Sequence, residues 1–151
     1  MDRTDKVAYT AKVHTTGGRE GAAQGDDGRL NIKLSSPGSC GAGTNPEQLF
    51  AAGWSACFEG AMGIAARKMQ ITLPPGTAID AEVDLCNTDG AFHLHARFTV
   101  SLPGLKHQLA QAIVDAAHQT CPYSKATRGN VDVAMSVVTS QPDNQTEEIH
   151  Q

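Results

Sequence analysis

The sequence contains no block of basic residues, because its 12 Lys and Arg are outnumbered by 16 Asp and Glu and the net charge is −4. Nucleic acid is therefore an unfavourable partner. The opening residues, MDRTDKVAYT, carry charges and lack the apolar region of a signal peptide. No apolar run approaches the roughly 20 residues that a membrane span needs. We therefore expect a soluble cytoplasmic protein that binds neither nucleic acid nor a membrane.

Short-range cysteine pairs are also missing. The four cysteines, Cys40, Cys57, Cys86 and Cys121, form no CxxC motif, and only His118 stands near one of them at a ligand-like spacing. A closed zinc site usually shows two short-range pairs, and structural disulfides are rare in a reducing cytoplasm. We therefore predict neither a metal site nor a cofactor, and each thiol is a core residue, an uninvolved surface residue or a catalyst.

A stretch rich in small residues surrounds Cys57. Residues 43–69 read GTNPEQLFAAGWSACFEGAMGIAARKM, in which Thr44 and Glu47 fit a capping box and Pro46 fits an early helical position. Each glycine inside a helix costs about 0.5–1 kcal/mol relative to alanine, and close backbone packing is the usual compensation. The sequence therefore predicts a long, largely buried central helix with Cys57 near its middle.

Strands and helices are segregated along the rest of the chain, which favours an α+β fold with antiparallel pairing. We predict a single domain over residues 1–140 and a polar, flexible tail over residues 141–151. The Gly-rich run at 15–29 is expected to be a loop, and the residues after Cys121 are expected to form a compact turn. The predicted strands are 7–15, 30–34, 77–85, 91–101 and 131–138, the second helix is 105–120, and the Gly-rich loop is 15–29.

Alternation of apolar and polar residues assigns faces to the third and fourth predicted strands. Phe92 and Phe98 are expected to point into the core. His93 and His95 are expected to point outward, as part of a polar sheet face rather than as metal ligands. Cys86 falls on the outward, acidic side of its strand and is interpreted as uninvolved in catalysis.

The reactivity of Cys57 depends on its pKa. Burial in an apolar helix would raise that pKa, so the thiol is inert unless a cation is brought to it. Arg19, in the Gly-rich run, is the candidate cation, and Glu47 could hold it through an ion pair. The alternatives, a solvated loop arginine and a helix-capping glutamate, stay open. Cys121 lies at the C-terminus of the second predicted helix, where the helix dipole disfavours an anion by roughly 0.3–1 kcal/mol if exposed. If a cation reaches Cys57, that cysteine is therefore predicted to attack first and Cys121 to resolve.

Three apolar residues near the start and middle of the central helix could line a pocket for alkyl chains. They are Leu49, Phe50 and Phe58. Each of them could equally be an ordinary core residue, and the sequence does not decide between the two interpretations.

Four segments together resemble the organic hydroperoxide resistance (Ohr) proteins of the Ohr/OsmC superfamily. They are TTGGREG at 15–21, GTNPEQLFAAGWSACFEGA around Cys57, SLPGL at 101–105 and AHQTCPYSKATRGNVDV at 117–133. The resemblance covers about residues 9–139. It implies an OsmC-like fold, in which curved antiparallel sheets wrap around long central helices. It also implies an intertwined homodimer with two active sites built from both chains.

The same resemblance implies a thiol peroxidase that reduces alkyl and fatty-acid hydroperoxides. Cys57 would be the peroxidatic cysteine and Cys121 the resolving one, with a disulfide between them. Arg19 would stabilise the thiolate, and Glu47 would hold Arg19. The dithiol of a lipoylated protein, or another dithiol, would reduce the disulfide again.

The sequence departs from the family pattern at Trp54, where a tyrosine is expected, and at Cys86, where a glycine is expected. Two other interpretations remain open from the residues alone. One is a non-catalytic thiol redox sensor or small-molecule binder on the same scaffold. The other is a structural zinc module, which the cysteine spacing disfavours.

Overall fold

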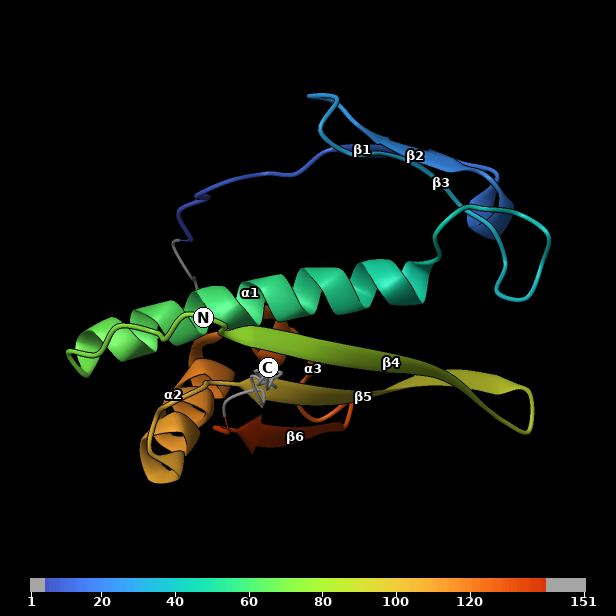
Figure 1. Ribbon diagram of the computed structural model, residues 1–151. Coiled ribbons are helices and arrows are strands. Elements are labelled where there is room, and N and C mark those ends of the chain that lie inside the picture. The colour runs from blue at the N-terminus through green and yellow to red at the C-terminus, as the bar shows by residue number, and fades with distance from the viewer. Residues whose placement is uncertain (1–4, 141–151) are drawn as a thin grey trace, which may run out of the picture. The chain divides into compact units, whose positions relative to one another are not determined.

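The structure is a computed structural model that describes residues 5–140, so the tail predicted at 141–151 lies outside the described residues. The chain divides into two compact units, Met1–Leu49 and Phe50–Gln151. The boundary falls inside the long helix α1, Pro46–Lys68 (Figure 1). The single domain over residues 1–140 stays a prediction, and each unit is described by itself.

The first unit contains a three-stranded antiparallel sheet in the order β1-β2-β3. Strand β2 lies where a loop was expected, because its short AAQG sequence has little intrinsic strand propensity and is held by pairing on both sides. The predicted strand at 7–15 is also displaced, since β1 covers only the end of that range and one further residue. The strands are β1 Val13–Thr16, β2 Ala22–Gly25 and β3 Asn31–Lys33.

A single 3₁₀ turn, Gly18–Glu20, connects β1 to β2 and carries Arg19. Gly17 before it has a φ of 72°, in the left-handed region that favours glycine. A Cβ at Gly21 would lie 1.8 Å from the carbonyl oxygen of Thr16. Backbone geometry that requires glycine on both sides therefore fixes the place of Arg19 in its unit.

Helix α1 begins with a cap from Asn45, not with the capping box predicted between Thr44 and Glu47. The Asn45 Oδ1 atom accepts a hydrogen bond from the Gln48 backbone N–H at 2.9 Å. The Thr44 hydroxyl instead donates to the Gln48 side chain at 2.7 Å. Pro46 stands at the first helical position, as predicted, which makes Asn45 the last non-helical residue. Glu47 is therefore free to pair with another side chain.

The second unit combines the rest of α1 with a mixed three-stranded sheet in the order β4-β5-β6. Strands β4 and β5 pair antiparallel, but β5 and β6 pair parallel, so the expected antiparallel pairing is wrong for the last strand. Helices α2 and α3 carry the chain back to the middle of β5, where β6 begins beside Ala96, as a parallel connection requires. Helix α3 replaces part of the predicted turn. The elements are β4 Ala78–Thr88, β5 Ala91–Ser101, α2 His107–Thr120, α3 Pro122–Thr127 and β6 Val133–Val138.

The core of this unit lies between α1, α2 and the inner face of the sheet. Trp54, Phe58 and Met62 project from one side of α1 and have no exposed surface. Phe98 from β5 makes edge-to-face contacts with Trp54 and Phe58, at ring-centroid distances of 4.9 and 5.7 Å. Burial of each large apolar side chain contributes roughly 1.5–3 kcal/mol. Aromatic packing therefore holds α1 on the sheet.

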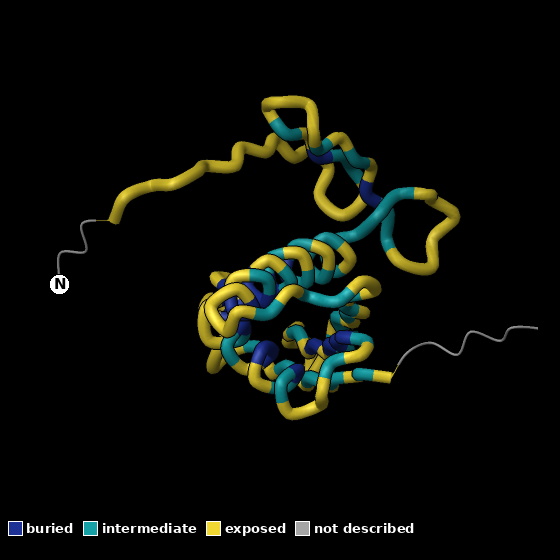
Figure 2. The backbone as a smooth tube through the Cα atoms, turned by 60° about the vertical axis from the view of Figure 1, so that its left-hand side comes forward, coloured by how far each residue is buried: buried dark blue, intermediate teal, exposed yellow. Residues whose placement is uncertain are grey.

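Helix α1 is also long and apolar enough, by length and composition alone, to cross a membrane. It has 23 residues, and an 18-residue window of it has a mean hydropathy of 1.3. The core helix of a soluble protein passes the same test. Six residues of α1 are buried in the structure, so its apolar character is used in packing along one side, while other positions on the helix are exposed (Figure 2).

In the described part of the second unit, no third strand pairs with the turn end of the β4–β5 hairpin. Strand β6 pairs only with residues 96–101 of β5, whereas β4 and β5 pair over 11 residues each. Phe92, predicted to point into the core, is 66% exposed, because β6 does not extend beside it. The alternation is confirmed closer to β6, where Phe98 and Val100 are buried.

A hydrogen bond between two buried side chains joins α1 to α3 and gives a test of this packing. Trp54 Nε1 donates to Ser124 Oγ at 3.2 Å, and neither residue has exposed surface. Ser124→Ala leaves the indole N–H without an acceptor, so the free energy of unfolding should fall by about 1–3 kcal/mol. Urea denaturation at a fixed protein concentration measures the change. Ser136→Ala, at an exposed position of β6, is the matched control, and equal stability of the two variants would contradict the packing.

Candidate active site

Two free thiols lie in contact in the second unit. Cys57, near the middle of α1, and Cys121, between α2 and α3, are 64 residues apart in sequence, yet their Sγ atoms are 3.6 Å apart. Cys57 is half-buried, whereas Cys121 has no exposed surface. A small molecule from solvent can therefore approach Cys57 but not Cys121. The contact is that of two thiols placed to form a disulfide after a small rotation of either side chain.

The position of Cys121 follows from two helices that meet at this residue. Its backbone N–H donates to the Ala117 carbonyl and ends α2, and Pro122 at the first position of α3 continues the chain. The dipole of α2 does not act on Cys121 alone, because α3 starts at the same residue. The complete burial of Cys121 is the stronger reason to expect that Cys57 reacts first.

Burial raises the pKa of the Cys57 thiol, and the neighbouring sulfur of Cys121 raises it further. The backbone N–H of Tyr123, in the first turn of α3, acts against both by donating to the Cys57 sulfur, which lowers the pKa. The net direction is upward. The surroundings that the second unit provides therefore keep Cys57 protonated at neutral pH, and a nearby positive charge is needed to make the thiolate.

The first unit holds a charged pair of the kind that the sequence suggested. Arg19 donates two parallel hydrogen bonds to Glu47, at 2.9 Å and 2.7 Å. This hydrogen bonding lowers the pKa of Glu47 and raises that of Arg19. The side chain of Glu47 is only 13% exposed, against 46% for Arg19. Glu47 thus fixes one edge of the guanidinium and leaves part of it accessible.

The three candidate residues for an alkyl pocket differ in burial. Phe58 has no exposed surface and belongs to the core, so the interpretation as an ordinary core residue holds for it. Phe50 is half-buried and packs its ring edge-to-face on Trp54 at a centroid distance of 5.6 Å. Leu49 is also half-buried. Of the three, Leu49 and Phe50 retain surface that a ligand can touch.

His118 is a residue of this region that the sequence pointed to only as a possible zinc ligand. It lies on the last turn of α2, and its ring is 6.4 Å from that of Phe58. Its Nδ1 atom is buried and has no hydrogen-bond partner among the described residues. Burial, and then the charge of Arg128, lower the pKa of His118. The ring is therefore neutral at physiological pH and adds no charge to the thiol pair.

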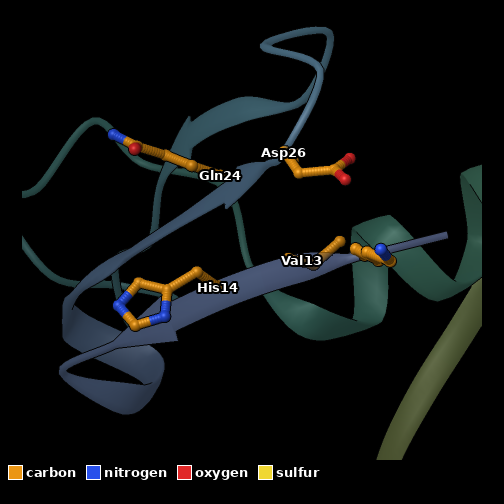
Figure 3. A pocket seen from close by; sticks show the side chains of 6 residues that line it. Val13, His14, Gln24 and Asp26 are labelled. Atoms are coloured by element: carbon orange, nitrogen blue, oxygen red, sulfur yellow. The ribbon is translucent and has the colours of Figure 1, made fainter.

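Two surface pockets are lined by described residues other than the two thiols. One of about 320 Å³ lies on the first unit and is lined by Lys12, Val13, His14, Gln24, Gly25 and Asp26. His14 and Gln24 are opposite each other on β1 and β2, and Figure 3 shows their side chains leaving neighbouring strands. Another, of about 550 Å³, is formed in the second unit around Pro75 and Pro103. Neither of these two linings includes a cysteine.

Comparison with known proteins gives consistent matches. The family model described as OsmC-like protein matches residues 36–136. The organic hydroperoxide resistance protein of Xanthomonas axonopodis pv. citri (strain 306) is 46% identical over 141 residues, which are 91% of this chain and 99% of the relative.

Solved structures agree in fold as well as in sequence. The crystal structure of the organic hydroperoxide resistance protein OhrB of Bacillus subtilis has a TM-score of 0.82 and 43% identity, over 87% of this chain and 99% of that one. An organic hydroperoxide resistance protein from Legionella pneumophila has a TM-score of 0.83 and 41% identity, over 89% and 100% of the two chains. These comparisons confirm the resemblance of the sequence and the mixed α/β fold that it implied.

Proposed function

The chain belongs to the OsmC-like family, beside its organic hydroperoxide resistance proteins, and on this basis we propose that it is a thiol-dependent peroxidase. Its substrates are alkyl and fatty-acid hydroperoxides, and its role is defence against oxidative stress. The contact of 3.6 Å between the half-buried Cys57 and the fully buried Cys121 is the observation that carries the proposal.

In the first step the Cys57 thiolate attacks the distal oxygen of ROOH. The O–O bond breaks, an S–O bond forms, and the alkoxide takes a proton and leaves as the alcohol. Cys57 is thereby oxidised to a sulfenic acid. The burial of Cys121 supports this order, because the peroxide reaches only Cys57.

In the second step the Cys121 sulfur attacks the sulfenic acid of Cys57. An S–S bond forms, and the sulfenic oxygen leaves as water with the thiol proton. A dithiol of the lipoyl class then opens the disulfide by two exchange reactions, which restore both thiols and leave the reductant as its cyclic disulfide. No external cofactor takes part in these steps.

Arg19 and Glu47 complete the site in this proposal. The guanidinium of Arg19 favours the Cys57 thiolate and donates to the peroxide oxygen that becomes anionic. Two observations support this role. Burial raises the pKa of Cys57, which creates the need for a cation, and Glu47 holds Arg19 by a two-point ion pair. Leu49 and Phe50 supply apolar surface for the alkyl group.

We also propose that the protein is a homodimer that buries the exposed side of α1. Ala52, Ala56, Gly60 and Ile64 follow one another at four-residue spacing, and all four are exposed. A Cβ added at Gly60 would meet no atom within 4 Å among the described residues. Such a row of small residues lets a second helix approach closely, which would offset the cost of glycine in the helix.

The cysteine variants test the proposed chemistry. With cumene hydroperoxide and dihydrolipoamide, Cys57→Ser should lower the steady-state rate by at least about a thousandfold, because the nucleophile is lost. Cys121→Ser should complete one turnover and stop with a sulfenic acid on Cys57, which dimedone labelling and mass spectrometry detect. Cys40→Ser removes an exposed thiol and should change neither result.

Retention of turnover by Cys57→Ser would contradict the assignment. Oxidation of the wild-type protein without repeated turnover, with dihydrolipoamide or with glutathione as the reductant, would favour a redox sensor instead.

The charge of Arg19 should determine the pH dependence. Because a nearby cation favours the thiolate, Arg19→Ala should raise the pKa of Cys57 and move the pH profile of kcat/KM toward higher pH. Each unit of displacement lowers the thiolate fraction about tenfold at pH 7, so the variant should lose at least about tenfold at pH 7 and less at pH 9. Arg29→Ala, which alters a highly exposed arginine of the same unit, is the control. An Arg19→Ala profile that overlays the wild-type profile would exclude the role.

The proposed dimer has a matched pair of test variants. Ala56→Leu adds the same bulk to the exposed row of α1 that Ala112→Leu adds to an exposed position of α2. Ala56→Leu should raise the dimer dissociation constant by at least about tenfold, since overpacking an interface typically costs 1–3 kcal/mol. Sedimentation velocity over a range of concentrations measures it. A wild-type protein that is monomeric at micromolar concentration would refute the dimer.

A further inference from the structure

Three side chains with metal-binding atoms gather on the outer face of the β4–β5 hairpin. Cys86 on β4 lies directly opposite His93 on β5, and His95 is the next outward residue along β5. One ligand atom from each of the three lies within 4.8 Å of the other two. The two imidazole rings are in edge-to-face contact at a centroid distance of 5.2 Å. The sequence placed both histidines on a polar face, but the strand register brings a thiol to them.

The backbone that carries these residues is regular up to the turn. The two strands pair from Ala78 opposite Ser101 to Thr88 opposite Ala91. The turn is closed by a hydrogen bond from the Gly90 N–H to Asn87 Oδ1 at 2.8 Å. Cys86 and His93 are therefore held at a fixed separation by the ladder, and only side-chain rotations are left to adjust the distances between ligand atoms.

We propose that Cys86, His93 and His95 form a binding site for a divalent transition-metal ion of the Zn²⁺ type. One thiolate and two imidazoles suit such borderline ions and do not suit Mg²⁺ or Ca²⁺, which prefer oxygen ligands. In a tetrahedral site with Zn–S near 2.3 Å and Zn–N near 2.0–2.1 Å, ligand atoms are about 3.4–3.6 Å apart. The three atoms must therefore approach one another by at most about 1.4 Å, and the fourth position is open to water.

The charges beside the cluster favour a cation. Glu82 and Asp84 lie on the same outward face of β4, and Arg97 bonds to both, at 3.1 Å to Glu82 and 2.9 Å to Asp84. Two carboxylates against one guanidinium leave a net negative charge next to His95. Because Asp84 is already paired with Arg97, it does not compete with the three proposed ligands.

The proposed site is separate from the thiol pair. The inward residues of β4, such as Ile79 and Val83, pack against the core that contains Cys121, and Cys86 has the opposite parity on the strand. An experiment that disproves the metal site therefore leaves the proposed peroxidase activity untouched, and the reverse also holds. Variants of Cys86, His93 and His95 should keep the wild-type rate of hydroperoxide reduction.

The test is a calorimetric titration of the tag-free, reduced full-length protein with Zn²⁺. The wild-type protein should bind one equivalent at this site with micromolar or tighter affinity. Cys86→Ser, His93→Gln and His95→Gln should each weaken this binding by at least about tenfold. Cys40→Ser and His107→Gln, which change an exposed thiol and an exposed histidine elsewhere, should leave it unchanged.

Co²⁺ gives a second readout that a general loss of folding would not imitate. The wild-type protein should show thiolate-to-Co²⁺ charge-transfer absorption, which Cys86→Ser abolishes and Cys57→Ser retains. The proposal is overturned if binding is lost in Cys57→Ser and kept in Cys86→Ser, since the metal would then occupy the thiol pair. It is equally overturned if the wild-type protein shows no saturable binding below about 1 mM.

Discussion

The second unit depends on one packing interaction, the burial of one side of α1 against α2, α3 and the sheet. Trp54 and Phe58 fix the rotation and depth of the helix, because both are fully buried and both contact Phe98. The indole of Trp54 also bonds to Ser124, three residues after Cys121. The same packing that forms the core therefore sets the distance between the two sulfurs. In the proposed mechanism, residues that touch neither sulfur therefore control whether the disulfide can form, and the stability of the core and the redox chemistry depend on the same residues.

This arrangement is electrostatically unfavourable for the proposed reaction, which needs the thiolate of Cys57. Burial on an apolar helix, beside a second sulfur, favours the neutral form of Cys57 and raises its pKa. The N–H of Tyr123 offsets only part of this effect. A guanidinium is suited to stabilise the thiolate in the proposed mechanism, because it keeps its charge when partly desolvated and can be oriented by a carboxylate. In the first unit, Glu47 orients Arg19 by accepting two hydrogen bonds from its guanidinium. The turn that carries Arg19 needs glycine at position 21, because a Cβ there would collide with the backbone.

The sequence predicted the features that depend on local pattern and composition. Helix α1, the outward histidines of β5 and the stop after α2 follow from spacing, alternation and Pro122. Prediction from the sequence failed where pairing or packing with a distant segment of the chain decides the structure. Strand β2 is held by pairing on both sides, and the parallel pairing of β6 depends on the path of α2 and α3. Phe92 is exposed because β6 begins only beside Ala96. The contact of Cys57 with Cys121 is of this second kind, and only the family resemblance made it predictable.

The position of Cys86 shows how the fold keeps a third thiol out of the redox pair. Side chains alternate along β4, so Cys86 faces outward while Val83 faces the core. To bring Cys86 inward, the strand would have to shift its register by one residue, which would turn every apolar side chain of β4 to the outside and every acidic one to the core. Burial of unpaired carboxylates alone would cost several kcal/mol each. Within one chain, a mixed disulfide between Cys86 and Cys57 or Cys121 therefore requires loss of the sheet, and the native register itself excludes it.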